Sequence, residues 1–177
     1  LQDGFEPKDG RKKNTIMTDG DFYPELLKKE GGFRYKKILS STAANFRKYI
    51  VGSAAERNDV FFMRTSQNTI ILRYSDVLLM YAEAVARGAN PTAGTAASAV
   101  NLVRQRAGLS TLSSVTADQV MDEKYAELGM EWGIRYFDMV RLGNTTALSY
   151  DGRTFTMEKQ FLPYPLAQVD KINALSK

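Results

Sequence analysis

The sequence predicts a mainly α-helical domain, an irregular one with long loops and short strands. Apolar side chains recur at helical spacing between residues 73 and 141. Glycines instead break the first 70 residues into apolar pieces too short for that periodicity. The chain has 177 residues and is 44% hydrophobic, which is enough apolar mass for a domain with its own core. We therefore treat residues 1–177 as one domain.

This domain divides into three parts along the chain: a loop and short-strand part (1–70), a helical part (71–142) and an extended tail (143–177). Strands are expected in the first part where side chains alternate or where β-branched and aromatic residues cluster. Four segments meet that description: Phe33–Lys36, Asn45–Val51, Phe61–Met63 and Thr69–Leu72. The tail is predicted to be extended before Pro163 and Pro165, because a proline disfavours helical backbone at the preceding residue.

The helical part begins at Arg73. Its first helix carries one narrow charged stripe on an otherwise apolar surface, which predicts a largely buried helix. Gly88 and Pro91 end it, since glycine supplies the C-terminal turn and proline cannot continue the hydrogen-bond ladder. A second helix over Ala96–Arg106 closes at Gly108. The two helices are expected to form an antiparallel hairpin.

A third helix is predicted to begin at the capping box formed by Thr116 and Gln119 and to run through Arg141. One face is an apolar stripe and another is charged. Gly129 and Gly133 lie four residues apart on a third side, where they would let another backbone come close at a cost in helix propensity.

Composition excludes most enzyme chemistry. The chain has no histidine and no cysteine, so catalytic triads, thiol nucleophiles, His-bound metals and disulfides are ruled out. Carboxylate chemistry, lysine or hydroxyl nucleophiles, oxygen-ligated cations and simple binding remain, and no cofactor is predicted. The net charge is +4, but the basic residues are scattered, so no nucleic-acid partner is predicted. The longest strongly apolar run, Val77–Ala82, is far shorter than the roughly 20 residues of a membrane span.

The charged face of the third helix offers two carboxylates, Glu127 and Glu131. A glycosidase places its two carboxylates on opposite sides of a sugar, roughly 5 to 10 Å apart across a cleft. Residues one helical turn apart on one face suit that task poorly. The same face allows ion pairs between Glu131 and Arg135, and between Asp138 and both Arg135 and Arg141. We favour a structural salt-bridge network and keep the glycosidase as an alternative.

Aromatic residues in the glycine-rich first part are candidates for ligand binding. Tyr23, Tyr35 and Tyr49 lie where loops or short strands are expected, and exposed tyrosines there could stack on sugar rings. The alternative is that they fill the core, as most aromatic side chains do at least in part. The sequence pattern does not separate the two.

Several motifs together resemble the C-terminal region of the SusD/RagB family. Residues 72–84 (LRYSDVLLMYAEA) and 101–109 (NLVRQRAGL) are followed by 123–128 (EKYAEL) and 131–141 (EWGIRYFDMVR), and residues 163–165 (PYP) resemble the family's closing segment. Residues 5–11 are similar to the stretch that precedes these helices in the family. Lys124 replaces a usual Arg, and Trp132 separates a Glu and a Gly that are usually adjacent.

This resemblance implies a surface glycan-binding lipoprotein of Bacteroidetes. Such proteins are not enzymes and need no cofactor: they capture extracellular oligosaccharide or polysaccharide and pass it to a SusC-like TonB-dependent transporter in the outer membrane. The family's lipid-bearing cysteine and tetratricopeptide-type helices would lie upstream of Leu1, so membrane contact is expected only through an anchor outside this chain. Peptide or other nutrient binding in the same uptake system, and a protein–protein scaffold, remain alternatives.

Overall fold

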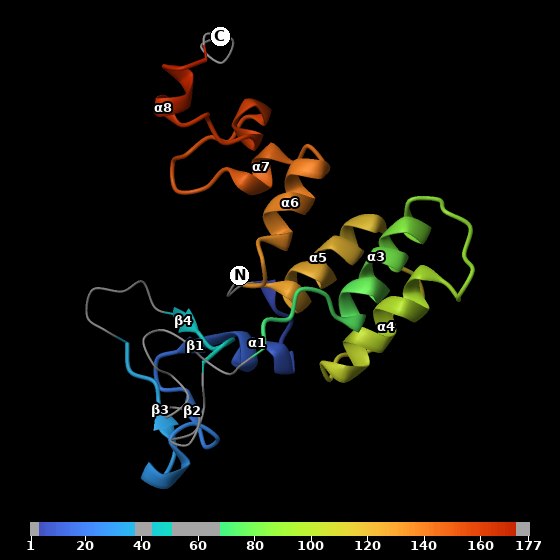
Figure 1. The fold of residues 1–177 in the computed structure, drawn as a ribbon. Coiled ribbons are helices and arrows are strands. Elements are labelled where there is room, and N and C mark those ends of the chain that lie inside the picture. The colour runs from blue at the N-terminus through green and yellow to red at the C-terminus, as the bar shows by residue number, and fades with distance from the viewer. Residues whose placement is uncertain (1–3, 38–43, 51–67, 173–177) are drawn as a thin grey trace. The chain divides into compact units, whose positions relative to one another are not determined.

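The computed structural model describes residues 4–37, 44–50 and 68–172. It divides into two compact units, Leu1–Trp132 and Gly133–Lys177, which are treated separately below. The described elements are mostly helices, with four short strands, so the predicted fold class is confirmed (Figure 1). Within these described ranges no helix combines the length and apolarity needed to cross a membrane.

The first unit opens with short elements. In chain order they are α1 (Gly10–Thr15), β1 (Ile16–Thr18), β2 (Phe22–Tyr23), the 3-10 helix η2 (Lys28–Glu30), β3 (Phe33–Arg34) and β4 (Ala44–Phe46). Strands β1 and β4 pair antiparallel with Ile16 opposite Phe46, and β2 pairs antiparallel with β3. Two predicted strands therefore occur in shortened form, at Phe33–Arg34 and Ala44–Phe46.

The other two strand predictions have different outcomes. Phe61–Met63 lies outside the described residues. The strand or buried segment predicted at Thr69–Leu72 is wrong, because residues 68–72 form no strand and Ile70, Ile71 and Leu72 are exposed. β-Branched composition favours extended backbone, but a strand also needs a neighbour to pair with.

A small core stabilises the strands. Met17, Tyr23, Leu26 and Tyr35 are buried together, with Phe33 packed against them. The hydroxyl of Tyr23 donates toward main-chain carbonyls of α1 and β1, at 3.2 Å from Lys13 O and 3.3 Å from Ile16 O. The tyrosine ring therefore contributes apolar burial while its polar end is satisfied.

Three helices form the larger core. They are α3 (Tyr74–Ala86), α4 (Ala96–Arg106) and α5 (Ala117–Leu128), and α3 packs against both of the others. Their buried residues meet in one cluster: Leu79, Ala82, Ala96, Ala99, Val100, Val103 and Val120. Helices α3 and α4 are the predicted neighbours, and Gly88 closes α3 with a φ of 102°. The capping box at Thr116 and Gln119 is present with both of its hydrogen bonds.

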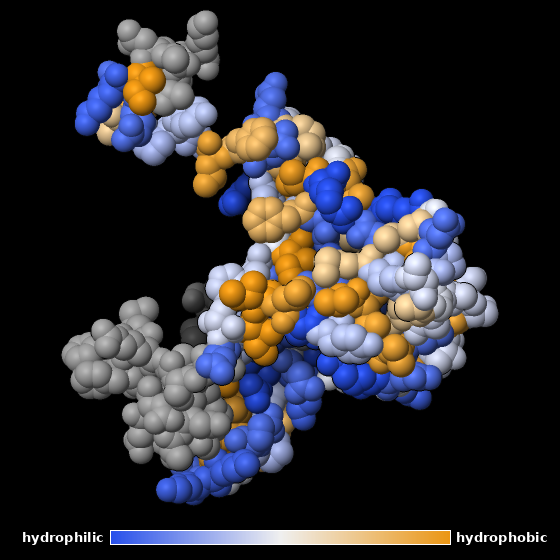
Figure 2. Space-filling model, turned by 45° about the vertical axis from the view of Figure 1, so that its right-hand side comes forward, coloured by the Kyte–Doolittle hydropathy of each residue, from blue (hydrophilic) through white to orange (hydrophobic). Residues whose placement is uncertain are grey.

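Helix α3 is less buried than its sequence predicts. Its charged residues Asp76 and Glu83 are buried, whereas Tyr74, Val77 and Met80 are exposed. Figure 2 shows hydrophobic residues, in orange, on the visible face of the molecule. The reason is that α4 and α5 pack against part of the helix circumference only, and an apolar pattern alone does not say which faces find a neighbour.

The predicted third helix is interrupted. Helix α5 ends at Leu128, and α6 begins at Ile134. Gly129 takes an extended ψ of 133°, while Met130, Trp132 and Gly133 have φ values of 69°, 42° and 69°. The two glycines therefore flank a break between helices, so their predicted place inside one helix is wrong.

Side chains from elsewhere explain this break. In a continuous helix the carbonyl of Glu127 would accept the amide of Glu131. Here it accepts from Lys48 Nζ at 3.1 Å and from Arg73 Nη2 at 2.7 Å. The carbonyl of Gly129 accepts from the same Lys48 at 2.8 Å. Distant cations thus satisfy the last carbonyls of α5, which leaves the chain free to turn.

The second unit contains α6 (Ile134–Arg141), α7 (Thr145–Leu148), the 3-10 helix η3 (Met157–Gln160) and α8 (Leu166–Val169). Tyr136 makes edge-to-face contacts with Phe137 and Phe155, at ring-centroid distances of 5.5 and 6.0 Å. Residues 162–164 form no helix or strand, as the two prolines predict, but the tail also contains the short helices α7, η3 and α8.

Candidate functional site

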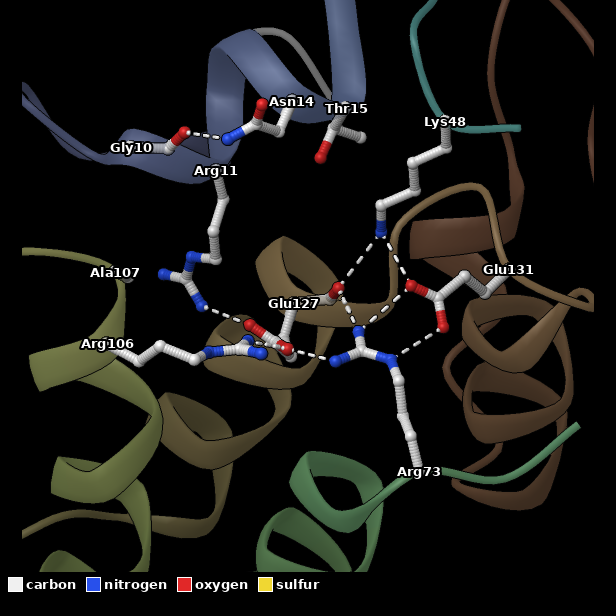
Figure 3. A pocket seen from close by; sticks show the side chains of 10 residues that line it. All are labelled: Gly10, Arg11, Asn14, Thr15, Lys48, Arg73, Arg106, Ala107, Glu127 and Glu131. Carbon is white, nitrogen blue, oxygen red and sulfur yellow. Dashed lines mark hydrogen bonds and ion pairs between the residues drawn. The ribbon is translucent and has the colours of Figure 1, made fainter. Parts of the chain in front are cut away.

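A group of charged side chains lines a cavity of about 390 Å³ in the first unit. Five segments contribute: α1, the residues after β4, the residue before α3, the end of α4, and the end of α5 with the turn that follows it (Figure 3). The described residues that line it are Gly10, Arg11, Asn14, Thr15, Lys48, Arg73, Arg106, Ala107, Glu127 and Glu131.

Glu127 lies at the centre of this cavity, and its side chain is 1% exposed. One carboxylate oxygen, Oε1, accepts from both Arg73 and Arg106. The other, Oε2, lies 3.3 Å from Nη1 of Arg11. Three arginines from three separate segments therefore converge on one carboxylate, as Figure 3 shows.

Glu131 forms a second junction. Its Oε1 lies 2.7 Å from Lys48 Nζ and 2.9 Å from Arg73 Nη2, while its Oε2 accepts from Arg73 Nε at 3.0 Å. Arg73 is thereby bidentate on Glu131 and also bonds Glu127, so one guanidinium joins both carboxylates. This is the geometry for which a planar guanidinium is suited and an ammonium is not.

Arg11 also lines a second cavity, of about 350 Å³, into which the network continues. Arg11 Nη1 lies 2.6 Å from Glu123 Oε1, and its Nη2 lies 2.7 Å from Asp9. Arg104 binds the other oxygen of Glu123 at 3.0 Å and reaches Glu6 at 2.6 Å. Glu123 thus links α1 to α4 across α5.

These pairs fix the ionisation of the carboxylates. Burial raises the pKa of Glu127, but hydrogen bonds from Arg73 and Arg106 outweigh it and lower the pKa to about 2. Burial likewise raises the pKa of Glu131, and hydrogen bonds from Arg73 and Lys48 more than reverse that effect. Both carboxylates are therefore ionised at neutral pH. Neither is available as the proton donor that a glycosidase needs.

The predicted salt-bridge network is present, and its buried carboxylate Glu127 is held by arginines from distant segments. The local pair Arg141–Asp138 also forms as expected, at 2.9 Å. The partners found for Glu131 come from the segments after β4 and before α3, and Glu131 itself lies in the turn between α5 and α6. Lys48, Arg11 and Arg106 were not singled out by sequence reasoning, since no spacing rule links residues so far apart. Arg73 carried one signal, its position on the charged stripe of an otherwise apolar helix.

The three candidate tyrosines differ in exposure. Tyr23 is 0% exposed and Tyr35 is 6% exposed, because both belong to the small strand core. The expectation that they offer a ring face to a ligand is therefore wrong, since a buried ring has no face to stack on. Tyr49 is 48% exposed, and ligand contact at Tyr49 stays a prediction. Within the described residues, no group of three or more carboxylates is placed to hold a metal ion.

Comparison with known protein families shows which family the chain belongs to. A model of the SusD family matches residues 2–174. The chain belongs to the SusD family. A SusD-like protein from Bacteroides ovatus is 38% identical over 134 residues, which is 73% of this chain and 23% of that protein. The resemblance seen in the sequence motifs is thereby confirmed.

Solved SusD-type structures share the fold. A crystal structure with xylogluco-oligosaccharide is 28% identical, with a TM-score of 0.75, over 99% of this chain and 44% of that one. Surface glycan-binding protein A from Bacteroides uniformis is also 28% identical, with a TM-score of 0.74, over 98% of this chain and 38% of that one. The chain thus spans less than half the length of these structures and about a quarter of the B. ovatus relative.

Proposed function

We propose that this SusD-family chain belongs to a non-catalytic protein that binds an extracellular glycan at the outer-membrane surface. The observation that carries the proposal is the likeness, over 99% of the chain, to a structure with xylogluco-oligosaccharide. The likeness to a surface glycan-binding protein of B. uniformis supports the same ligand class and the same location. The bound glycan would then pass to a SusC-like TonB-dependent transporter, and a lipid anchor outside this chain would hold the protein at the membrane.

The chemistry of the charged cavity supports binding over hydrolysis. Glycoside hydrolysis needs one carboxyl group that is protonated and one that is free to attack or to activate water. Glu127 and Glu131 are both ionised and each is held by cations, so they serve neither role as they stand. Their bonds instead fix five chain segments to one another, which gives a rigid base for a binding surface.

Isothermal titration calorimetry with the intact protein tests this proposal. The panel contains xylogluco-oligosaccharide, other soluble oligosaccharides and a mixture of peptides. We expect saturable binding of at least one oligosaccharide and no release of reducing sugar from it. Binding of peptides alone, or of no small ligand at all, would refute glycan capture and favour a peptide carrier or a scaffold. Progressive hydrolysis of the oligosaccharide would overturn the non-catalytic assignment.

Delivery and location need a separate test. Labelling of intact cells with a protein-specific antibody should reveal the protein at the surface, and detergent extracts should yield a complex with a TonB-dependent transporter. Retention of the protein inside the cell, or purification without any transporter, would contradict the delivery step.

A further inference from the structure

Trp132 is an exposed aromatic residue that the tertiary structure holds in place. Its side chain is 60% exposed, and its indole Nε1 donates to the carbonyl of Ile70 at 2.9 Å. The backbone of Trp132 has a φ of 42°, in the left-handed region that a bulky residue seldom adopts. Such a conformation costs on the order of 1 to 2 kcal/mol and persists only where the surroundings impose it.

Tyr49 shares both properties. Its side chain is 48% exposed, and its backbone φ is 67°. Burial raises the pKa of the Tyr49 hydroxyl, and the Glu131 carboxylate raises it further, so the hydroxyl lies within electrostatic reach of that carboxylate. Tyr49 and Trp132, two exposed aromatic residues with positive φ, therefore both lie close to Glu131.

One ion pair connects the two residues. Lys48 directly precedes Tyr49, Glu131 directly precedes Trp132, and Lys48 Nζ lies 2.7 Å from Glu131 Oε1. Lys48 and Glu131 both line the charged cavity (Figure 3). The two aromatic residues thus follow, in the chain, the two residues that form one edge of this cavity. The ion pair therefore holds the two chain segments that carry these rings next to each other.

Glu131, which lines the charged cavity beside Lys48, can still accept a hydrogen bond. The five N–H donors of Arg73 are all used, on Ser75, Glu127 and Glu131. A carboxylate has about four acceptor positions. Three hydrogen bonds reach Glu131 from the described residues, two on Oε1 and one on Oε2. Glu131 Oε2 can therefore accept one more hydrogen bond, for example from a hydroxyl group.

We propose that Tyr49 and Trp132 form the aromatic rim of a subsite for a neutral sugar ring, with Glu131 Oε2 accepting one of its hydroxyl groups. This proposal rests on the proposed glycan-binding function and assigns residues to it. A pyranose ring has an apolar C–H face that suits an aromatic ring and hydroxyl groups that suit a carboxylate. A neutral sugar is favoured, because Lys48 and Arg73 are already engaged with carboxylates and main-chain carbonyls.

Calorimetric titration of the intact protein with xylogluco-oligosaccharide tests the subsite. Trp132→Ala and Tyr49→Ala should each weaken binding by roughly 2- to 12-fold, which corresponds to the loss of one aromatic contact. Trp132→Phe should retain most of the affinity, because it keeps a flat ring. Phe22→Ala removes another exposed aromatic of the same unit, on strand β2, and should leave the affinity unchanged.

Further measurements distinguish a loss of folding from a loss of sugar binding. Circular dichroism and thermal melts show whether each variant folds. If an alanine variant does not fold, the leucine variant at the same position takes its place, because leucine keeps apolar bulk but has no flat ring. Trp132 is the single tryptophan of this chain, so an emission shift on sugar binding that is lost in Trp132→Phe would report on this ring. Unchanged affinity in folded Trp132→Ala and Tyr49→Ala would overturn the subsite and leave the glycan-binding function standing. Failure of the unmodified protein to bind any oligosaccharide of the panel would refute the function itself.

Discussion

Lys48 Nζ and Glu131 Oε1 meet at 2.7 Å, although the two residues lie 83 positions apart in the chain. The same ammonium group donates to the carbonyls of Glu127 and Gly129. One lysine therefore caps the end of α5, pairs with the turn that follows and fixes the segment after β4 to both. The stability of this region should depend on that residue.

Lys48→Ala should destabilise the protein by about 2 to 4 kcal/mol, because it removes three charge-assisted hydrogen bonds and leaves the carbonyl of Gly129 without its donor. Chemical denaturation measures the loss. Lys29→Ala removes an exposed lysine on η2 and should change stability by less than about 0.5 kcal/mol. Equal effects of the two substitutions would show that the Lys48 bonds contribute nothing in solution.

Glu127→Gln should be more damaging, with an expected loss of about 3 to 5 kcal/mol, because three arginines would then face a neutral amide in a buried site. Asp122→Asn is the matched control, since Asp122 is an exposed carboxylate on the same helix. Denaturant midpoints of the two variants give the comparison. A Glu127→Gln variant as stable as Asp122→Asn would mean that the buried network is energetically neutral.

The free energy of unfolding should fall at acid pH, because Glu127 becomes protonated there. Its pKa is about 2 in the folded protein against an ordinary value of 4.5. A lowered pKa stabilises the folded state above pH 4.5, and this contribution is lost as the pH falls from 4.5 toward 2. The full effect is on the order of 3 kcal/mol. Unfolding free energies measured across this range should fall more steeply for the unmodified protein than for Glu127→Gln, and parallel curves would contradict the assignment.

Alanine substitutions at Gly31 and Gly32 distinguish the cost of a left-handed backbone from the cost of a steric clash. Gly31 and Gly32 have φ values of 85° and 101°. A Cβ at Gly31 would meet no atom within 4 Å, so Gly31→Ala should cost only the left-handed backbone penalty of about 1 to 2 kcal/mol. A Cβ at Gly32 would lie 2.6 Å from Phe22 Cζ and 3.2 Å from Pro24 Cα, so Gly32→Ala should cost more. Thermal melts that show equal losses would contradict this account.

Helix starts and stops were predictable from the sequence, because they depend on neighbours along the chain. The capping box at Thr116 and the glycine turn at Gly88 are both present as predicted. The same local rules failed between Leu128 and Ile134, where the helical pattern continues but the helix does not. Nothing near Glu127 in the sequence indicates that its carbonyl is bound by Lys48 and Arg73.

The mainly helical fold, the lack of imidazole and thiol chemistry, and the family all follow from the amino-acid sequence, because periodicity, composition and ordered motifs are properties of the chain. Which charges meet depends instead on the folded arrangement, since the partners of Glu127 come from α1, α4 and the residue before α3. The same arrangement leaves Tyr23 buried while Tyr49 and Trp132 are exposed. Burial and long-range ion pairs depend on which segments become neighbours in space, and no local pattern encodes that.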